Sequence, residues 1–426
     1  MAASIQHPSY TPPTFDKATS EAARQGAASY LASRLAAGSS SSSSNGPSSF
    51  TVPTIDLSPS FTGDLAARQR VAAQIRAACT TSGFFTITGH GIPERACATV
   101  LEQARRFFHE LSPAQKDAIH MRQSTLHRGY EPPAYTTFVE GNGAESKEGF
   151  NWGYEPALDV DGCGDGRYVE LDGTPLAPGE SANLWPKEED LPGFFEGVRG
   201  YYGECLGLAR HLFRLFALSL GLEEGHFDEM VTHPGGIARL MYYPAKEKEV
   251  EAKEGEDDKI GLGAHSDYEC FTLLLPSSTP GLEILSPEGK WVPVGKVEGG
   301  LIVNVGDFLM RWTNDQYKST VHRVVNRTKE ARYSVPFFFS INYDQVVETL
   351  PNCVSEDNPS KYPPIRAGEY ILERANNITA GGKGIPFSPL PRTPFSLFLT
   401  VRFRLLWKLR HLLREIENSI IFSSST

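Results

Sequence analysis

Short apolar runs rich in Val, Ile, Leu and Phe dominate the chain from Ile237 onwards, and they constrain the fold more than any other feature. Gly, Pro, Asn and Asp separate these runs, as they separate the strands of an antiparallel sheet. Runs of this length and spacing are typical of a sandwich or barrel. They are Ala238–Tyr243, Cys270–Leu275, Leu301–Val305, Ser319–Val325 and Tyr333–Ile341. We therefore expect a mainly β fold that also contains α-helices.

The first half of the chain shows helical spacing instead. Apolar residues recur at intervals of three and four over 64–80 and 193–220, which predicts two helices that each bury one face. Ser112 and Pro113 divide 94–119 into a helix pair, because Ser can cap a helix and Pro suits its first turn. Short strands are expected near 52–57 and 84–87.

Three segments depart from these patterns. Residues 1–49 include a serine run, Ser39 to Ser44, that cannot bury apolar area, so we expect a disordered low-complexity extension. The charged segment from Lys246 to Lys259 predicts a solvated loop between two strands. Residues 376–426 form an atypical basic tail with three interpretations: an amphipathic helix that associates with a membrane surface or a partner, a helix packed on the domain, or sequence foreign to the functional protein.

Charge and cysteine usage narrow the functional class. Acidic residues number 51 and basic residues 41, and the net charge of -10 argues against a nucleic-acid partner. No uncharged apolar run is long enough to span a membrane, and Met1 to Pro13 lack the pattern of a secretory signal. The 6 cysteines are dispersed without CxxC pairs, which predicts reduced thiols. These features favour a cytoplasmic location.

His265-Ser266-Asp267 is the first sign of a metal site. In a strand, residues i and i+2 point to the same side, so His265 and Asp267 can converge on one ion. His322 lies in a later strand-like run, far enough along the chain to belong to the returning strand of a sandwich. Two imidazoles and one carboxylate suit non-haem Fe(II) and leave coordination positions open for substrate and oxygen.

Two other interpretations of these residues remain open. The same side chains could hold zinc, and Glu269, on the same side as Asp267 by strand parity, could then serve as a general base. His322 could instead be a core histidine that donates a hydrogen bond to a backbone carbonyl.

Arg332 and Ser334 follow His322 and share one strand face by the two-residue period. A guanidinium can make two parallel hydrogen bonds to a carboxylate, and the serine hydroxyl can donate a third. Tyr243, at the end of an earlier run, offers another hydroxyl. This set suits a ligand carboxylate, and the alternative is an arginine in a surface ion pair.

From about Phe50 to Arg374 the chain resembles the iron(II)- and 2-oxoglutarate-dependent dioxygenases of the isopenicillin N synthase-like family, and within it the fungal, thymine hydroxylase-like members. His265-x-Asp267, His322 and Arg332-x-Ser334 are similar in order and spacing to that family's metal and co-substrate motifs. Met241 departs from the family, which commonly has Asn at this position. Further similarity lies in turn, cap and packing motifs, namely Ile55-Asp56-Leu57, Gly83-Phe84-Phe85, Gly89-His90-Gly91-Ile92, Phe107-Phe108, Leu111-Ser112, Arg128-Gly129-Tyr130, Lys147-Glu148, Asn183-Leu184-Trp185-Pro186, Val305-Gly306-Asp307 and Trp312-Thr313-Asn314.

The resemblance implies a distorted double-stranded β-helix, or jelly-roll, flanked by helices. It implies a helical and mixed leading region over 50–235 and a catalytic jelly-roll core over 236–375. It further implies Fe(II) on the His-Asp-His set, 2-oxoglutarate with its far carboxylate on Arg332, Ser334 and Tyr243, and O2 as the oxidant. The expected enzyme is a monomer that hydroxylates or desaturates a small-molecule metabolite of secondary metabolism and releases succinate and CO2.

Two rival functions stay open beside this one. The first is an oxidase that does not use 2-oxoglutarate and binds its substrate's own carboxylate on Arg332. The second is a catalytically inactive jelly-roll binding module. Aromatic residues are the expected substrate contacts, each with core packing as its alternative. They are Phe338, Tyr268, Phe271, Phe150 and Tyr130.

Overall fold

The computed structural model describes residues 50–136, 145–159, 168–176, 180–247 and 261–378. Two of the segments singled out above, 1–49 and the tail beyond 378, lie outside the described residues, as does most of the charged segment from Lys246 to Lys259.

An eight-stranded sheet is the largest element, in the order β1-β2-β10-β7-β12-β5-β4-β3. All neighbouring strands pair antiparallel except β1 and β2. Because β2 pairs with β10 and β4 with β5, the leading region and the core share this sheet. Its strands are β1 (Thr54–Asp56), β2 (Phe84–Thr88), β3 (Gly129–Glu131), β4 (Glu148–Gly153), β5 (Gly236–Tyr243), β7 (Phe271–Pro276), β10 (Leu301–Val305) and β12 (Arg332–Phe339).

A smaller sheet of four strands, in the order β6-β11-β8-β9, faces the large one. Its strands are β6 (Leu262–His265), β8 (Leu282–Leu285), β9 (Trp291–Pro293) and β11 (His322–Val324), and β13 (Val346–Val347) and β14 (Ile365–Arg366) form a separate pair. Leu262 and Ile284 of the small sheet share a hydrophobic cluster with Met241 and Ile302 of the large one. The fold is therefore the predicted mainly β jelly-roll with helices, and the described strands do not close into a barrel.

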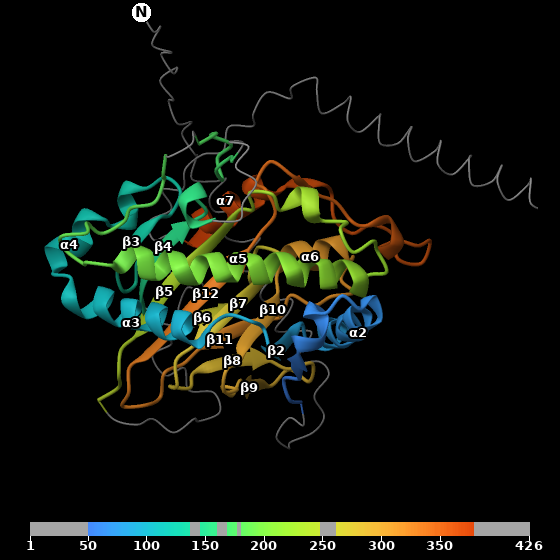
Figure 1. The fold of residues 1–426 in the computed structure, drawn as a ribbon, viewed down its shortest axis with the longest axis horizontal. Helices are drawn as coiled ribbons and strands as arrows, with labels where there is room; N and C mark the ends of the chain where they lie inside the picture. Colours follow the sequence, from blue (N-terminus) through green and yellow to red (C-terminus); the bar gives the residue numbers. More distant parts are fainter. Residues whose placement is uncertain (1–49, 137–144, 160–167, 177–179, 248–260, 379–426) are drawn as a thin grey trace, which may run out of the picture. The chain divides into compact units, whose positions relative to one another are not determined.

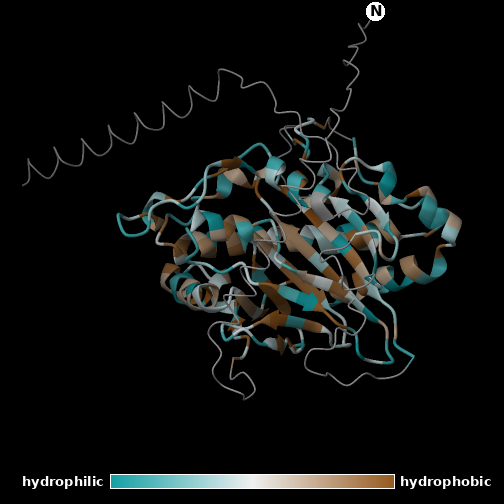
Figure 2. Ribbon diagram, turned by 180° about the vertical axis from the view of Figure 1, so that it is seen from behind, coloured by the Kyte–Doolittle hydropathy of each residue, from teal (hydrophilic) through white to brown (hydrophobic). Residues whose placement is uncertain are grey.

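Helices cover the outer face of the large sheet. In Figure 1, α5 lies across the strands, with α3 and α2 beside it. Phe271 and Phe337 of the sheet join Leu212 and Phe216 of α5 in one core, and the strands appear as brown, hydrophobic stretches in Figure 2. The helices are α2 (Leu65–Thr81), α3 (Glu94–Glu110), α4 (Pro113–Ala118), α5 (Phe194–Ser219), α6 (Asp307–Trp312) and α7 (Ala367–Ile378), with short 3-10 turns at Ser58–Phe61, Met121–Gln123, Pro156–Leu158, Asp228–Met230 and Pro351–Cys353.

The predicted helices are confirmed, and side-chain caps explain where two of them begin. The side chain of Asp64 accepts a hydrogen bond from the Ala66 N–H and caps α2. Ser112 and Gln115 form a reciprocal capping box at the start of α4. The turn before β2 requires Gly83, because its φ is +71° and a Cβ there would lie 1.8 Å from the Lys318 carbonyl oxygen.

One predicted strand is shorter than expected. The apolar run Ser319–Val325 forms a strand only over His322–Val324. Ser319 and Thr320 lie outside the ladder, and their hydroxyls donate to the Asp307 carboxylate and the Ser82 carbonyl.

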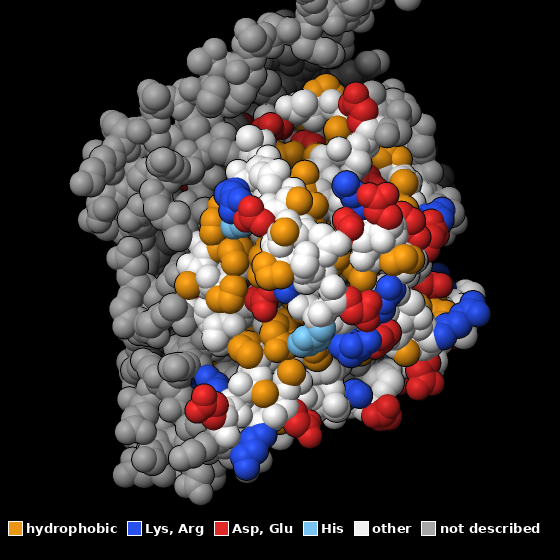
Figure 3. All heavy atoms as spheres, turned by 90° about the vertical axis from the view of Figure 1, so that its left-hand side faces the viewer, with side chains coloured by type: hydrophobic (Ala, Val, Ile, Leu, Met, Phe, Trp, Pro, Cys, Tyr) orange, Lys and Arg blue, Asp and Glu red, His pale blue; other side chains and the backbone are white. Residues whose placement is uncertain are grey.

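Three expectations from composition can be compared with the described residues. None of the described helices combines the length and apolar content that crossing a bilayer requires. The described cysteines, Cys79, Cys97, Cys205, Cys270 and Cys353, are free thiols. On the face shown in Figure 3, acidic and basic side chains are interspersed with apolar ones, without a continuous basic stripe among the described residues.

Candidate active site

His265, Asp267 and His322 meet at the edge of the small sheet. His265 ends β6 and pairs in register with His322, the first residue of β11. One potential ligand atom from each of the three residues lies within 4.8 Å of the other two. The predicted convergence is therefore present, but its expected basis is wrong. Asp267 lies in the loop after β6, so it joins the histidines through a turn and not by strand alternation.

Backbone carbonyls orient both imidazoles. The Nδ1 atom of His265 lies 2.8 Å from the Gly263 oxygen, and that of His322 lies 3.1 Å from the Thr320 oxygen. A carbonyl can only accept, so Nδ1 carries the proton and Nε2 presents a lone pair. The two Nε2 atoms lie 3.7 and 3.6 Å from Oδ1 of Asp267. The carbonyl bond expected of a core histidine is present at His322, yet it leaves Nε2 directed at the cluster, as in a metal ligand.

Two further side chains hold the carboxylate. Oδ2 of Asp267 accepts hydrogen bonds of 2.5 Å from the Thr272 hydroxyl and the Asn304 amide, which leaves Oδ1 facing the imidazoles. Burial favours a raised pKa for Asp267, but both imidazoles and these hydrogen bonds outweigh it and lower the pKa. Burial, and next the neighbouring His322, lowers the pKa of His265 to about 3. The set thus offers a carboxylate and a neutral imidazole near neutral pH.

Thr272 and Asn304 were not predicted as site residues. The sequence feature that could have indicated them is a polar residue at an inward position of an apolar run, as in Leu301–Val305.

If His265, Asp267 and His322 bind Fe(II), Asn304→Ala should weaken iron binding by about 10–100-fold, because partners of metal ligands fix their orientation. Competition with a chelator under anaerobic conditions would measure the change. Asn342→Ala is the matched control, since Asn342 is equally buried and bonds to Thr232 and His233 instead. Equal losses in both variants would contradict the assignment.

Arg332, Ser334 and Tyr243 line the space between the two sheets. Arg332 of β12 pairs in register with Tyr243 of β5, and its guanidinium lies 5.0 Å from the centre of the tyrosine ring. Nη1 of Arg332 donates to Ser334 at 3.1 Å, while Nε has no hydrogen-bond partner among the described residues. Burial lowers the pKa of Arg332 and raises that of Tyr243.

Arg332 is only 1% exposed, so the alternative of a surface ion pair is wrong. Among the described residues no acidic side chain forms an ion pair with it. A cavity of about 50 Å³ joins the Arg332 guanidinium to the His-Asp-His cluster, with apolar walls from Leu262, Leu282 and Val324. A buried cation beside such a cavity requires an anion, and a ligand carboxylate has the matching geometry.

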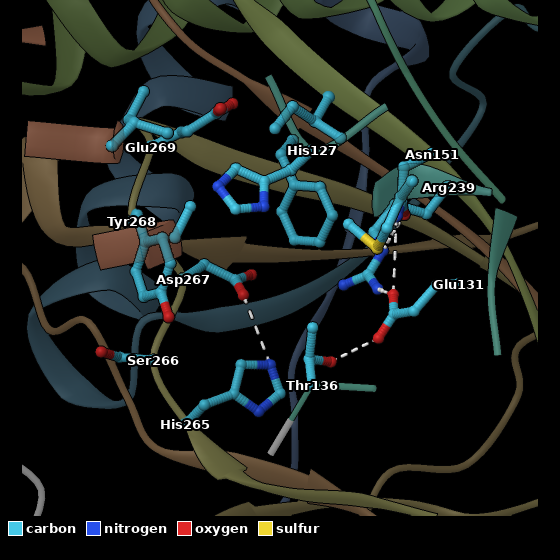
Figure 4. A pocket seen from close by; sticks show the side chains of 15 residues that line it. His127, Glu131, Thr136, Asn151, Arg239, His265, Ser266, Asp267, Tyr268 and Glu269 are labelled. Atoms are coloured by element: carbon cyan, nitrogen blue, oxygen red, sulfur yellow. Dashed lines mark hydrogen bonds and ion pairs between the residues drawn. The ribbon is translucent and has the colours of Figure 1, made fainter. Parts of the chain in front are cut away.

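A second pocket, of about 110 Å³, also borders His265 and Asp267. Figure 4 shows its polar residues around His265 and Asp267. Tyr268 and Phe338 line it, as predicted. The remaining lining comes from Met121, His127, Glu131, Thr136, Asn151, Ile237, Arg239, Ser266, Glu269, Ile371 and Ala375.

The prediction that Phe271, Phe150 and Tyr130 line the pocket is wrong. Phe271 and Phe150 are fully buried in the core beneath the helices, against Phe216 and Phe194 respectively. Strand alternation gives the reason, since their neighbours Thr272 and Asn151 face inwards instead. Tyr130 faces outwards in the same way, and its hydroxyl donates to Glu148.

A buried ionic network forms one wall of this pocket. Glu131 accepts from Lys147, Thr136 and Arg239, and Arg239 also donates through Nε to Asn151 at 2.6 Å. Burial favours a raised pKa for Glu131, but Lys147 and Arg239 outweigh it and hold the pKa far below its usual range. Sequence reasoning missed Arg239, although the two-residue period from Tyr243 places it on the same inner face.

Lys147→Met should lower the free energy of unfolding by about 3–5 kcal/mol, because it leaves Glu131 buried with an incomplete set of partners. The contribution of this carboxylate should be lost as the pH falls, because its folded pKa lies below its unfolded pKa. Urea denaturation would measure both effects. Lys187→Met is the control, since Lys187 is 73% exposed and its pair with Glu189 should contribute little. A change at Lys147 as small as that at Lys187 would contradict this description of the wall.

Glu269 and His127 form the polar end of the same pocket. Burial raises the pKa of Glu269 well above its usual range. Residues 266–270 form no strand, so the prediction that strand alternation places Glu269 on the same side as Asp267 is wrong. Figure 4 shows the Glu269 carboxyl directed across the pocket towards His127. A carboxyl aimed away from the cluster is poorly placed to act as a general base there, which disfavours the zinc hydrolase.

Comparison with known proteins agrees with this geometry. Residues 234–341 match the 2OG-Fe(II) oxygenase superfamily, and residues 52–188 match the family described as non-haem dioxygenase in morphine synthesis N-terminal. The chain is 38% identical over 325 residues to the 2-oxoglutarate-Fe(II) type oxidoreductase hxnY of Emericella nidulans, covering 75% of this chain and 88% of that relative. It is 34% identical to clavatol oxidase claD of Penicillium crustosum, covering 73% and 91% of the two chains. The structure of Neurospora crassa T7H in complex with alpha-KG and thymine superimposes with a TM-score of 0.64 at 28% identity, over 77% of this chain and 97% of T7H.

Proposed function

The chain belongs to the 2OG-Fe(II) oxygenase superfamily, and on this premise we propose which of its residues carry the reaction. It is an iron(II)- and 2-oxoglutarate-dependent dioxygenase that oxidises a small molecule. When bound, iron, 2-oxoglutarate and O2 supply the oxidising chemistry, and 2-oxoglutarate leaves as succinate and CO2. The protein's own contribution is to bind, orient and exclude water.

His265, Asp267 and His322 are the proposed iron ligands. The observation that carries this proposal is the meeting of three ligand atoms from β6, the following loop and β11. Carbonyl acceptors on both Nδ1 atoms and two donors on Asp267 hold the set in a coordinating state. Two imidazoles and one carboxylate form a donor set suited to Fe(II).

Arg332, Ser334 and Tyr243 are the proposed binding residues for the far carboxylate of 2-oxoglutarate. Nε of Arg332 has no hydrogen-bond partner within the part of the chain that the structure describes, and a bidentate carboxylate would use it, which supports this role. Apolar side chains around this cavity exclude water and strengthen the charge pair. Met241, opposite Ser334 in the register, offers no amide to the co-substrate.

The second pocket is the proposed substrate site. Tyr268, Phe338 and Arg239 would contact a molecule held against the iron ligands. The relatives support compact, ring-containing substrates, because T7H binds thymine and 5-formyluracil and claD is named a clavatol oxidase. A role in secondary metabolism, as a cytoplasmic monomer, completes the proposal.

Succinate release across a panel of fungal metabolites tests this function directly. Protein reconstituted anaerobically with Fe(II) and then exposed to O2 should form succinate in step with oxidised product. Product without succinate would identify the oxidase that does not use 2-oxoglutarate. Failure to retain iron would identify the inactive binding module, and turnover under argon would identify a hydrolase.

A further inference from the structure

The carboxyl of Glu269 is a buried polar group without a partner in the part of the chain that the structure describes. Glu269 is 3% exposed, and its Oε2 has no hydrogen-bond partner in the described ranges. It lines the substrate pocket, with its carboxyl directed across the pocket (Figure 4). Buried polar groups in native proteins are nearly always hydrogen-bonded, so an exception beside a pocket suggests a ligand group as the missing partner.

His127 stands opposite this carboxyl and presents an acceptor. Its Nε2 lies 3.1 Å from Oδ1 of Asn376 in α7, and an amide oxygen accepts, so Nε2 carries the proton. Nδ1 is therefore an acceptor. His127 also has φ +57°, in the left-handed region that non-glycine residues seldom occupy.

The rest of the pocket restricts what can lie between these groups. Ile237, Phe338 and Ile371 supply apolar walls, and the volume of about 110 Å³ is on the scale of one six-membered ring. The iron ligands His265 and Asp267 bound the pocket as well. A ring can therefore contact both the proposed metal site and the polar end.

Resting on the proposed function, we infer that Glu269 and His127 select a single-ring substrate that presents an O–H or N–H donor to them. His127 Nδ1 and a Glu269 carboxyl oxygen meet at this end, and the proton of a ligand hydroxyl or ring N–H can be donated to either acceptor. A carboxylate at the same place would offer no donor to His127 and would lose its hydration on burial, which disfavours binding. The C–H bond to be oxidised would then lie at the opposite side of the ring.

Three matched rings test this inference: 4-methylphenol, its methyl ether 4-methylanisole, and 4-methylbenzoate. Calorimetric titration would measure their dissociation constants, with the protein free and with Mn(II) and N-oxalylglycine in place of iron and 2-oxoglutarate. We expect 4-methylphenol to bind about tenfold or more tightly than the ether and the benzoate, the effect of one satisfied hydrogen bond in a buried site. Equal affinities, or no binding of any ring, would overturn the inference.

Variants assign the selectivity to the two residues. Glu269→Leu should remove most of the preference for the phenol, and Glu269→Gln should keep part of it. His127→Asn should reduce it, and Asn tolerates the left-handed backbone. Tyr168→Phe is the matched control, since it removes a buried hydroxyl that does not line the pocket. An unchanged preference in Glu269→Leu would overturn the inference, as would an equal loss in Tyr168→Phe.

The experiment separates this inference from the proposed function. Failure to take up Mn(II) and N-oxalylglycine would contradict the iron and co-substrate assignments. The preference among the three rings, measured on the free protein as well, would still decide the role of Glu269 and His127.

Discussion

Asp267→Ala should lose iron binding completely and reduce 2-oxoglutarate turnover to background. Asp267 supplies the single carboxylate of the set, and its Oδ1 lies within 3.7 Å of both Nε2 atoms. Two neutral imidazoles alone do not compensate the charge of a divalent ion in a buried site. Iron content after anaerobic reconstitution, measured beside succinate release, gives the result.

Loss of folding must be separated from loss of the ligand. Alanine leaves Thr272 and Asn304 without their acceptor, so stability should fall by about 1–3 kcal/mol. Asp307→Asn is the matched control, because Asp307 is also buried and its carboxylate accepts from Ser319 and Tyr370, outside the cluster. Asp307→Asn should retain iron. Retained iron or turnover in Asp267→Ala would show that the ligand assignment is wrong.

Arg332→Ala should raise the 2-oxoglutarate concentration required for half-maximal turnover by about 30-fold to several thousand-fold. Truncation of a buried bidentate charge pair costs about 2–5 kcal/mol, and each 1.4 kcal/mol is about a factor of ten. Iron affinity should change little, because Arg332 acts on the far end of the co-substrate. Initial rates of succinate formation against 2-oxoglutarate concentration would measure the shift.

Two further variants make this result specific. Arg332→Lys keeps the charge without the fork and should give an intermediate requirement. Arg327→Ala removes a nearby guanidinium that pairs with Glu283 at 2.6 Å, and it should leave the requirement unchanged. An unchanged requirement in Arg332→Ala would favour the oxidase that binds its substrate's own carboxylate.

Strand parity explains which site residues could be read from the sequence. Arg332, Ser334 and Phe338 occupy alternate positions of β12 and all face the interior. The same period on β5 places Arg239 beside Tyr243, so this residue was within reach of sequence reasoning. The same period on β7 separates Thr272 and Leu274, which line the cavity, from Phe271, which packs beneath α5.

Strand alternation cannot predict the side-chain directions of loop residues. Asp267 and Glu269 belong to a turn, so their directions follow from its local path and not from a period. His127 lies outside any helix or strand, in a left-handed conformation, and meets α7 through Asn376. No spacing rule relates residues that approach from such distant parts of the chain.

The sequence by itself determined the class of fold, the helices of the first half, the types of metal ligand and the arginine that would hold a carboxylate. Those features depend on local periods and on side-chain chemistry, which a linear chain displays. Only the tertiary structure decided which aromatic rings face the pocket, how Glu131, Lys147 and Arg239 neutralise one another, and that Glu269 faces His127. These depend on desolvation and on contacts between distant segments, which arise only when the two sheets and α7 pack around a shared cavity.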